Sequence, residues 1–254
     1  MHRLLLALFA AGVLWGQKQE KPPEWVLTFS EEFDGKELNF PKWIPRDAFG
    51  HERNREGQAY VPEAIEVKDG VARIVAQRRN ATYDGVRREF TSGMMTTFGS
   101  FAQTYGRFEI RCRVASGKGL ESKFWLMPVP SGDVPSIDVV DVVGSETKKA
   151  LFANRWGDER TERSYSGSAA VPDLADGFHT VSVEWDEKRI VWVVDGKQVF
   201  ESISGVAHQA MYLAVNLAVG GLTAKYPDSS ALFPAEFDVK YIHVYQLASR
   251  MPKR

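Results

Sequence analysis

The sequence contains one cysteine, and its charges nearly cancel. A single thiol, Cys112, excludes an internal disulfide and any zinc site built from several thiolates. The 32 Lys and Arg residues against 33 Asp and Glu residues give a net charge of −1, so charge does not favour nucleic acid or an anionic membrane as a partner. Helical periodicity is nearly absent, and there is no internal repeat and no Gly-rich phosphate-binding motif. Aromatic residues are abundant, at 12% of the chain, and they both fill β-sheet cores and form platforms for sugar rings.

Long hydrophobic runs are missing except at the N-terminus. There a short basic start precedes an apolar stretch from Leu4 to Trp15, and polar residues follow. The stretch is short for a membrane span and is typical of the hydrophobic segment of an export signal. We therefore expect residues 1–16 to be a signal peptide and 17–23 a flexible leader, with an uncleaved membrane anchor as the alternative. The protein is then secreted or periplasmic.

Alternation of polar and apolar residues with a period of two dominates the rest of the chain. Every second residue is apolar from Arg107 to Val114, and Thr180–Trp185 repeats the pattern. Further strands are predicted at Met211–Val219 and Phe237–Gln246. The pattern predicts one all-β sandwich over residues 24–248.

Turn signals separate several of these runs. The pair Asp69-Gly70 divides Ala64–Val67 from Val71–Gln77, and Asp195-Gly196 plays the same part later in the chain, as expected of β-hairpins. Helix is predicted only as short turns, near Pro41–Ile44 or in Ser229–Leu232.

Two aspartates, Asp138 and Asp141, interrupt an apolar run. An aspartate within a buried strand is costly unless its carboxylate is satisfied or used. Residues three apart lie on opposite faces of a regular strand, whereas a β-bulge at Val139–Val140 returns both aspartates to one face, as is common beside active sites. In the alternative, which spacing alone favours slightly, one aspartate faces solvent and the other accepts backbone hydrogen bonds.

Short motifs follow one another in a fixed order along almost the whole chain. They are Phe29–Gly35, Glu56–Tyr60, Thr91–Gly93, Tyr105–Glu109, Phe124–Trp125, Phe178–Trp185, Asn216–Gly221 and Val244–Gln246. In order and spacing these motifs resemble glycoside hydrolase family 16, the laminarinase- and lichenase-type β-glucanases. The resemblance implies a concanavalin A-like jelly roll of two antiparallel sheets with a concave glycan cleft, and an activity on β-linked glucan.

The family's catalytic motif reads Glu-x-Asp-x-x-Glu, for nucleophile, assisting aspartate and general acid/base. Here these positions hold Ser136, Asp138 and Asp141. A retaining glycosidase needs two carboxyl groups about 5–5.5 Å apart. Ser136 has no carboxylate and no evident base beside it, so it is a poor nucleophile. Asp141 is one methylene shorter than glutamate, and a displacement of about 1 Å can cost about a hundredfold in rate. The conventional double displacement is not available as the motif stands.

The resemblance also implies residues that contact the glycan. Trp125 is expected to form the floor of the central sugar subsite, with core packing as the alternative. Arg107 is expected to bind sugar hydroxyls, with a solvated strand face as the alternative. Arg155, which stands where the family usually has histidine, and Trp156 occupy positions of substrate contact. Asn54 lies in a loop that often carries a sugar-contacting asparagine.

Three further departures alter the expected cleft. Glu121 replaces a platform tryptophan in a predicted loop, so it either adds a carboxylate to the cleft or, like most loop glutamates, is solvated. Leu222–Ala224 stands where another tryptophan is common. Lys240 replaces a calcium-binding aspartate, and a cation there argues against calcium, so we expect no metal and no cofactor.

Two functions remain open at this stage. The first is an exported glycoside hydrolase for β-linked glucan, with Asp141 as general acid/base and Asp138 stabilising or attacking the oxocarbenium-like centre. The second is a lectin-like protein that binds glycan without cleaving it, and the serine at position 136 favours impaired or lost hydrolysis. A purely structural sandwich ranks last. The expected partner is a polysaccharide or oligosaccharide, with no nucleic acid or membrane partner, and the expected state is a monomer.

Overall fold

The computed structural model describes residues 23–48, 54–83, 85–130, 132–158 and 160–252. The predicted signal peptide, residues 1–16, and all but the last residue of the predicted leader lie outside the described residues. Within the described part of the chain, strands dominate, and no helix is long and apolar enough to cross a membrane.

The larger sheet has eight strands. In spatial order they are β16 (Lys197–Ser202), β15 (Ile190–Val194), β14 (His179–Trp185), β9 (Gly106–Arg113), β18 (Ala235–Leu247), β4 (Val71–Ala76) and β3 (Ile65–Lys68), with β1 (Trp25–Glu31) also paired to β18. All these pairs are antiparallel. The two Asp-Gly pairs form the predicted hairpin turns, between β3 and β4 and between β15 and β16.

The smaller sheet carries the features that matter for function. In spatial order its strands are β13 (Arg163–Ala170), β12 (Lys149–Trp156), β11 (Ser136–Val143), β10 (Leu120–Pro128), β17 (Met211–Val219) and β8 (Met94–Thr96). Two short pairs complete the strands: β2 (Gln58–Tyr60) lies parallel to β7 (Phe90–Ser92), and β5 (Ala81–Tyr83) is antiparallel to β6 (Val86–Arg88).

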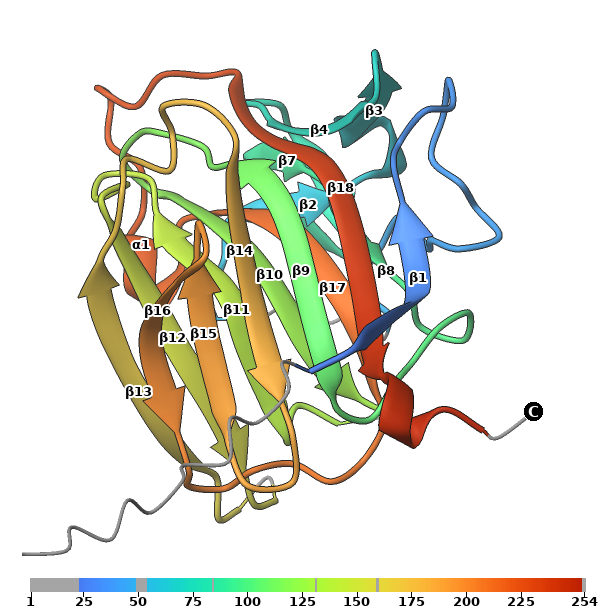
Figure 1. The fold of residues 1–254 in the computed structure, drawn as a ribbon. Coiled ribbons are helices and arrows are strands. Elements are labelled where there is room, and N and C mark those ends of the chain that lie inside the picture. The colour runs from blue at the N-terminus through green and yellow to red at the C-terminus, as the bar shows by residue number, and fades with distance from the viewer. Residues whose placement is uncertain (1–22, 49–53, 84, 131, 159, 253–254) are drawn as a thin grey trace, which may run out of the picture.

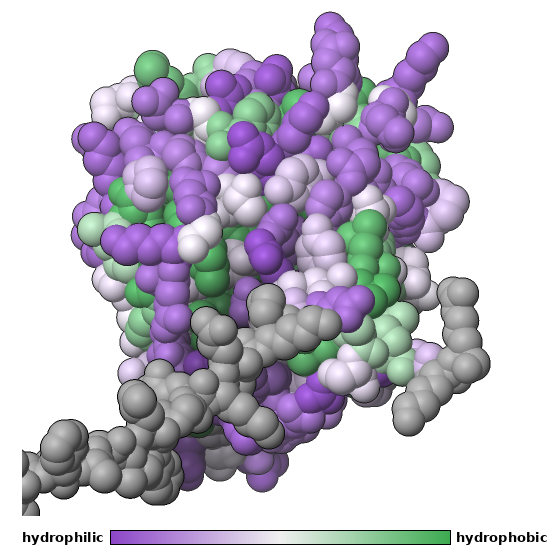
Figure 2. All heavy atoms as spheres, viewed as in Figure 1, coloured by the Kyte–Doolittle hydropathy of each residue, from purple (hydrophilic) through white to green (hydrophobic). Residues whose placement is uncertain are grey.

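The two large sheets pack face to face, with β9, β14 and β18 in front of β10, β11 and β17 in Figure 1. The period-2 pattern buries one face of each strand between them. Phe108 and Val183 come from one sheet and Phe124 from the other, and all three are fully buried. Trp185 and Trp192 are also buried. Figure 2 shows that hydrophilic side chains predominate on the outer face of the eight-stranded sheet. The predicted all-β sandwich is confirmed.

A β-bulge in β11 decides the placement of the two aspartates. Phe124 of β10 pairs with Val140, but the next residue pairs with Asp138, so Val139 has no partner across this ladder. Val139 and Val140 both join the core, and Asp138 and Asp141 both face the other way. Both aspartates are buried, at 2% and 5% exposure. The predicted bulge is confirmed, and the alternative with one solvated aspartate is wrong.

The predicted helical turns are wrong in position. Both Pro41–Ile44 and Ser229–Leu232 form turns without helix. The helical segments of the described chain are one α-helical turn, α1 (Gly221–Ala224), and two 3-10 turns, Pro62–Ala64 and Ala248–Arg250. These short elements follow strand ends and contribute little to the core.

Candidate functional site

A cleft of about 560 Å³ lies on the outer face of the six-stranded sheet. In β10, Phe124 and Leu126 point into the core, so Lys123 and Trp125 point into the cleft. The described residues that line it come from β2, β8, β10, β11, β12, β17 and the adjoining loops. They are Asn54, Glu56, Tyr60, Met94, Lys123, Trp125, Asp133, Ser136, Asp138, Arg155, Glu162 and Asn216.

Arg155 occupies one end of this cleft and neutralises Asp138. It is the cross-strand partner of Ser136, and its Nη1 donates to Asp138 Oδ2 at 2.8 Å. Its Nε lies 3.8 Å from Glu162 Oε1 at the exposed rim. The negative charge of Asp138 raises the pKa of Arg155, so the guanidinium stays charged. Asp138 is therefore held by a cation instead of being free beside the anomeric centre.

Lys123 neutralises the other aspartate. Its Nζ lies 3.3 Å from Asp141 Oδ2 and 3.4 Å from Glu121 Oε1. All three side chains are at most 10% exposed. Of the three, only Lys123 is among the described residues that line the cleft. The ammonium group thus lies between the buried carboxyl groups and the open space.

Burial raises the pKa of Asp141 well above its usual range, against the opposing charge of Lys123, and the negative charge and hydrogen bond of Glu121 raise it further. Burial alone lowers the pKa of Lys123, but the charges of Asp141, Asp138 and Glu121 outweigh it and raise that pKa. Lys123 therefore keeps its positive charge between these two buried carboxyl groups.

A chain of hydrogen bonds fixes Trp125, which is half-buried in the cleft. Its Nε1 donates to Asn216 Oδ1 at 3.1 Å, and Asn216 Nδ2 donates to Tyr60 Oη at 2.9 Å. Tyr60 Oη donates to Glu56 Oε2 at 2.8 Å, and Gln58 Nε2 donates to the same oxygen at 2.7 Å. Burial raises the pKa of Glu56. The ring is held in one orientation before any ligand arrives, as a sugar platform requires.

Trp192 of β15, a core residue, hydrogen-bonds to the strand that carries the two aspartates. Its indole Nε1 donates to the backbone oxygen of Asp138 at 2.7 Å. A bulge disrupts the ladder locally, and a buried carbonyl without a partner is costly. Trp192 therefore supplies a bond to the strand that carries both aspartates.

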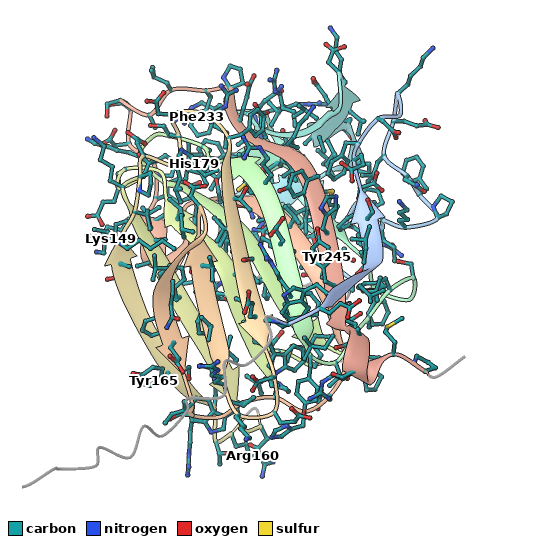
Figure 3. All side chains as sticks on the ribbon, in the orientation of Figure 1. Lys149, Arg160, Tyr165, His179, Phe233 and Tyr245 are labelled. Carbon is teal, nitrogen blue, oxygen red and sulfur yellow. The ribbon has the colours of Figure 1, made fainter. Side chains whose placement is uncertain are left out.

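Arg107 does not belong to this site, contrary to its predicted place in the cleft. It lies in β9 of the other sheet, forms an ion pair with Glu109, and places its guanidinium 6.0 Å from the centre of the Tyr245 ring. Figure 3 labels Tyr245 on β18, which belongs to the eight-stranded sheet, whereas the cleft lies on the six-stranded sheet. The alternative, a solvated strand face, is correct in placing Arg107 outside the cleft, but the side chain is only 30% exposed and is paired with Glu109.

Trp156 also lies outside the cleft. It follows Arg155 in β12, and successive strand residues point to opposite faces. Its ring lies over Gly205, where a Cβ atom would come within 1.9 Å of it. Glu121 needs a different correction, because it lies in β10 and not in a loop, and it is 2% exposed and not solvated. Asn54 does line the cleft.

Sequence reasoning missed several lining residues. Lys123 lies two residues before Trp125 on one strand, so the period of two would have placed both on the same face. Glu56, Tyr60 and Asn216 lie inside motifs already noted, but nothing in their type marked them as cleft residues. Asp133 and Glu162 come from loops and carried no pattern.

The described residues offer no group of three or more His, Cys, Asp or Glu side chains placed to hold a metal ion together. Lys240 lies in β18, where the family's calcium-binding aspartate was expected. An ammonium group cannot act as a calcium ligand, so the residues present do not fit that ion.

Comparisons with known proteins agree with this architecture. A family model described as "Glycosyl hydrolases family 16" matches residues 60–232. The chain is 32% identical over 243 residues to the endo-1,3-1,4-beta-glycanase ExsH of Rhizobium meliloti, covering 87% of this chain and 51% of that protein. It therefore spans about half the length of ExsH. It is 30% identical over 273 residues to a beta-glucanase of Rhodothermus marinus, covering 96% of this chain and 93% of that protein.

A solved structure shares the fold. The laminarinase catalytic domain from Thermotoga maritima superposes with a TM-score of 0.79 at 27% identity, covering 88% of this chain and 98% of that one.

Proposed function

Because the chain belongs to glycosyl hydrolase family 16, we propose that it binds a β-linked glucan in the cleft of the six-stranded sheet without hydrolysing it by the retaining mechanism. On the basis of the signal peptide predicted at residues 1–16, we also propose that the protein acts after export, in the periplasm or outside the cell. The relatives named above are a β-glycanase, a β-glucanase and a laminarinase, which supports β-glucan as the ligand.

One observation carries the proposal: at the three motif positions, all of which the structure describes, no carboxylate is without a cation beside it. The nucleophile's position holds Ser136, Asp138 is bound by Arg155, and Asp141 is bound by Lys123. Retaining hydrolysis requires one carboxylate to attack the anomeric carbon while a second carboxyl group protonates the leaving oxygen. Asp138 and Asp141 would each have to separate from their cation before they could attack the anomeric carbon or protonate the leaving oxygen.

The same cleft retains what binding needs. Trp125 presents a ring fixed by Asn216, and polar side chains surround it. Stacking on an aromatic face together with hydrogen bonds to hydroxyl groups is how a polar cleft holds a neutral sugar. The compensated charges of Lys123 and Arg155 fit an uncharged ligand.

The test measures binding and turnover together on the mature chain. We expect isothermal titration calorimetry to detect binding of mixed-linkage or β-1,3-glucan oligosaccharides, and reducing-sugar assays at high protein loading to detect no product. Trp125→Ala should weaken binding by about tenfold or more, since loss of a buried aromatic anchor commonly costs more than 1.4 kcal/mol. Trp156→Phe serves as the control, because Trp156 lies outside the cleft. Hydrolysis by the unmodified chain would refute the proposal.

A surviving hydrolase is the second candidate, and one observation favours it. Asp138 and Asp141 share a face of β11, and burial raises the pKa of Asp141, which is the direction of shift that favours a general acid. In that case Asp138 would stabilise or attack the oxocarbenium-like centre. Slow product release that disappears in both Asp141→Asn and Asp138→Asn would establish this candidate.

A further inference from the structure

Lys123 occupies the centre of the cleft sheet. It lies opposite Asp141 of β11 on one side and opposite Asn216 of β17 on the other. Both neighbours contribute to the site, and Lys123 lies two residues from Trp125 on the same face of β10. A glucan stacked on Trp125 therefore passes within reach of the Lys123 side chain.

The ammonium group of Lys123 has three N–H donors. Two of them face carboxylates, Glu121 Oε1 at 3.4 Å and Asp141 Oδ2 at 3.3 Å. Lys123 lines the cleft, and its side chain is 10% exposed. The third donor is thus available to an oxygen acceptor in the cleft, such as a sugar hydroxyl or a glycosidic oxygen.

We infer that Lys123 closes Asp141 off from the cleft and replaces it as the group that meets the bound glucan. The statement that Lys123 contacts the glucan rests on the proposed function, whereas the statement that Lys123 covers Asp141 does not. Lys123 is in this sense a positioning residue for Asp141 and a specificity residue for the ligand. An ammonium group donates hydrogen bonds and accepts none, so it selects oxygens that can accept.

A consequence follows for attempts to restore hydrolysis. Replacing Ser136 and Asp141 by glutamate supplies the two carboxyl groups that the retaining mechanism requires. With Lys123 in place, however, the acid at position 141 remains covered by an ammonium group and paired with it. The motif is then complete but its acid cannot reach the leaving oxygen.

The first test compares two variants of the full mature chain on mixed-linkage glucan and laminarin. They are Ser136→Glu with Asp141→Glu, and the same pair with Lys123→Ala. We expect the triple variant to exceed the double variant by roughly a hundredfold, the usual share of general acid catalysis. The rate of the triple variant should fall at alkaline pH, because its general acid ionises there. The pH–rate profile of the double variant should lack this alkaline decrease. Equal rates in the two variants would overturn the inference.

Two further variants serve as a control and as a replacement in this comparison. Lys149→Ala in the double background removes an exposed lysine of β12 that pairs with Glu146, and it should leave the rate unchanged. Lys123→Thr in the double background shortens and neutralises the side chain and has a high β-sheet propensity, so it replaces Lys123→Ala if that variant does not fold, as judged by circular dichroism. A gain with Lys123→Thr supports the inference, and no gain overturns it.

The second test concerns binding by the otherwise unmodified chain. Lys123→Met should weaken binding of a glucan tetrasaccharide by about tenfold, the usual effect of losing a hydrogen bond to a charged donor. Lys149→Met should change nothing. Unchanged affinity in Lys123→Met would show that Lys123 does not meet the glucan. If the unmodified chain binds no glucan, the proposed function fails, while the hydrolysis test still decides whether Lys123 covers Asp141.

Discussion

Arg155 lies directly across the ladder from Ser136, and its guanidinium donates to Asp138. The serine thus leaves room at the position that the family motif gives to the nucleophile, and the arginine uses the neighbouring carboxylate as its counterion. Compared with the family motif, the site has one negative charge fewer at position 136 and a cation at position 155, so the charge of Asp138 is compensated. This compensation agrees with the neutral ligand that we propose.

We expect Arg155→Met to destabilise the fold. Asp138 is 2% exposed, and a buried carboxylate that loses its cation costs roughly 3 kcal/mol. Urea unfolding should show a lower midpoint with an unchanged slope. Arg160→Met, at an exposed turn, is the control and should match the unmodified protein. Equal midpoints for Arg155→Met and the control would mean that Asp138 does not depend on this cation.

Trp192→Phe should weaken both stability and glucan binding. The change removes the donor to the Asp138 carbonyl, and an unsatisfied buried carbonyl costs about 1–3 kcal/mol. Trp185→Phe removes a comparable bond, from Trp185 Nε1 to the Ala207 carbonyl at 3.0 Å, which does not involve β11. Both variants should lose stability in urea unfolding, but only Trp192→Phe should lose affinity in calorimetry. A loss of affinity in both would assign the effect to general destabilisation.

Asp141→Asn should alter the pH dependence of stability. Burial raises the pKa of Asp141 in the folded state above its ordinary value of 3.8. The stabilisation from the protonated form is complete below pH 3.8 and is lost as the pH rises through the folded-state pKa, because the unfolded chain has already released the proton. Asparagine stays neutral, so the variant should gain on the unmodified protein by up to about 1.4 kcal/mol per pH unit between pH 3.8 and the folded-state pKa, and the gain should stay constant above it. Urea unfolding at pH 4 and pH 8 measures the difference, and a constant offset would contradict the prediction.

Azide should rescue turnover of an activated substrate. A dinitrophenyl β-laminaribioside needs no acid for its leaving group, so only a nucleophile is missing at Ser136. Azide entering the space beside Ser136 should attack the anomeric carbon, displace dinitrophenolate and give the α-glycosyl azide. Release of dinitrophenolate should depend on azide and not on chloride. The same assay on Ser136→Glu should lose the dependence on azide, and absence of rescue in the unmodified chain would show that the sugar does not reach this position.

The strand pattern and the bulge were open to prediction from local rules. Val139 and Val140 are apolar neighbours between two aspartates, and only a bulge lets both valines enter the core while both aspartates leave it. The same rules also could have separated Arg155 from Trp156, since adjacent strand residues cannot line one face. The family resemblance places both residues in contact with substrate, but alternation along β12 allows only one of them to face the cleft, and that one is Arg155.

The ion pairs were beyond prediction from pattern alone. Glu121 and Lys123 look like solvated charges in the sequence, and their burial depends on β10 lying between β11 and β17. Arg107 shows the reverse problem, because an arginine on a strand's polar face reads the same whether that strand lines a cleft or lies on the other sheet. Strand order within the sheets is a long-range property, and it decided both outcomes.

The bulge at Val139 has a consequence for how such a protein changes over generations. It brings positions 138 and 141 to the same face of β11 through the backbone, with both valines in the core. Side chains at these positions can therefore be exchanged by single substitutions, with no insertion or rearrangement of the strand. Under the role inferred for Lys123, however, hydrolysis returns only when that residue changes as well, so the return of the acids and the return of chemistry are separate steps.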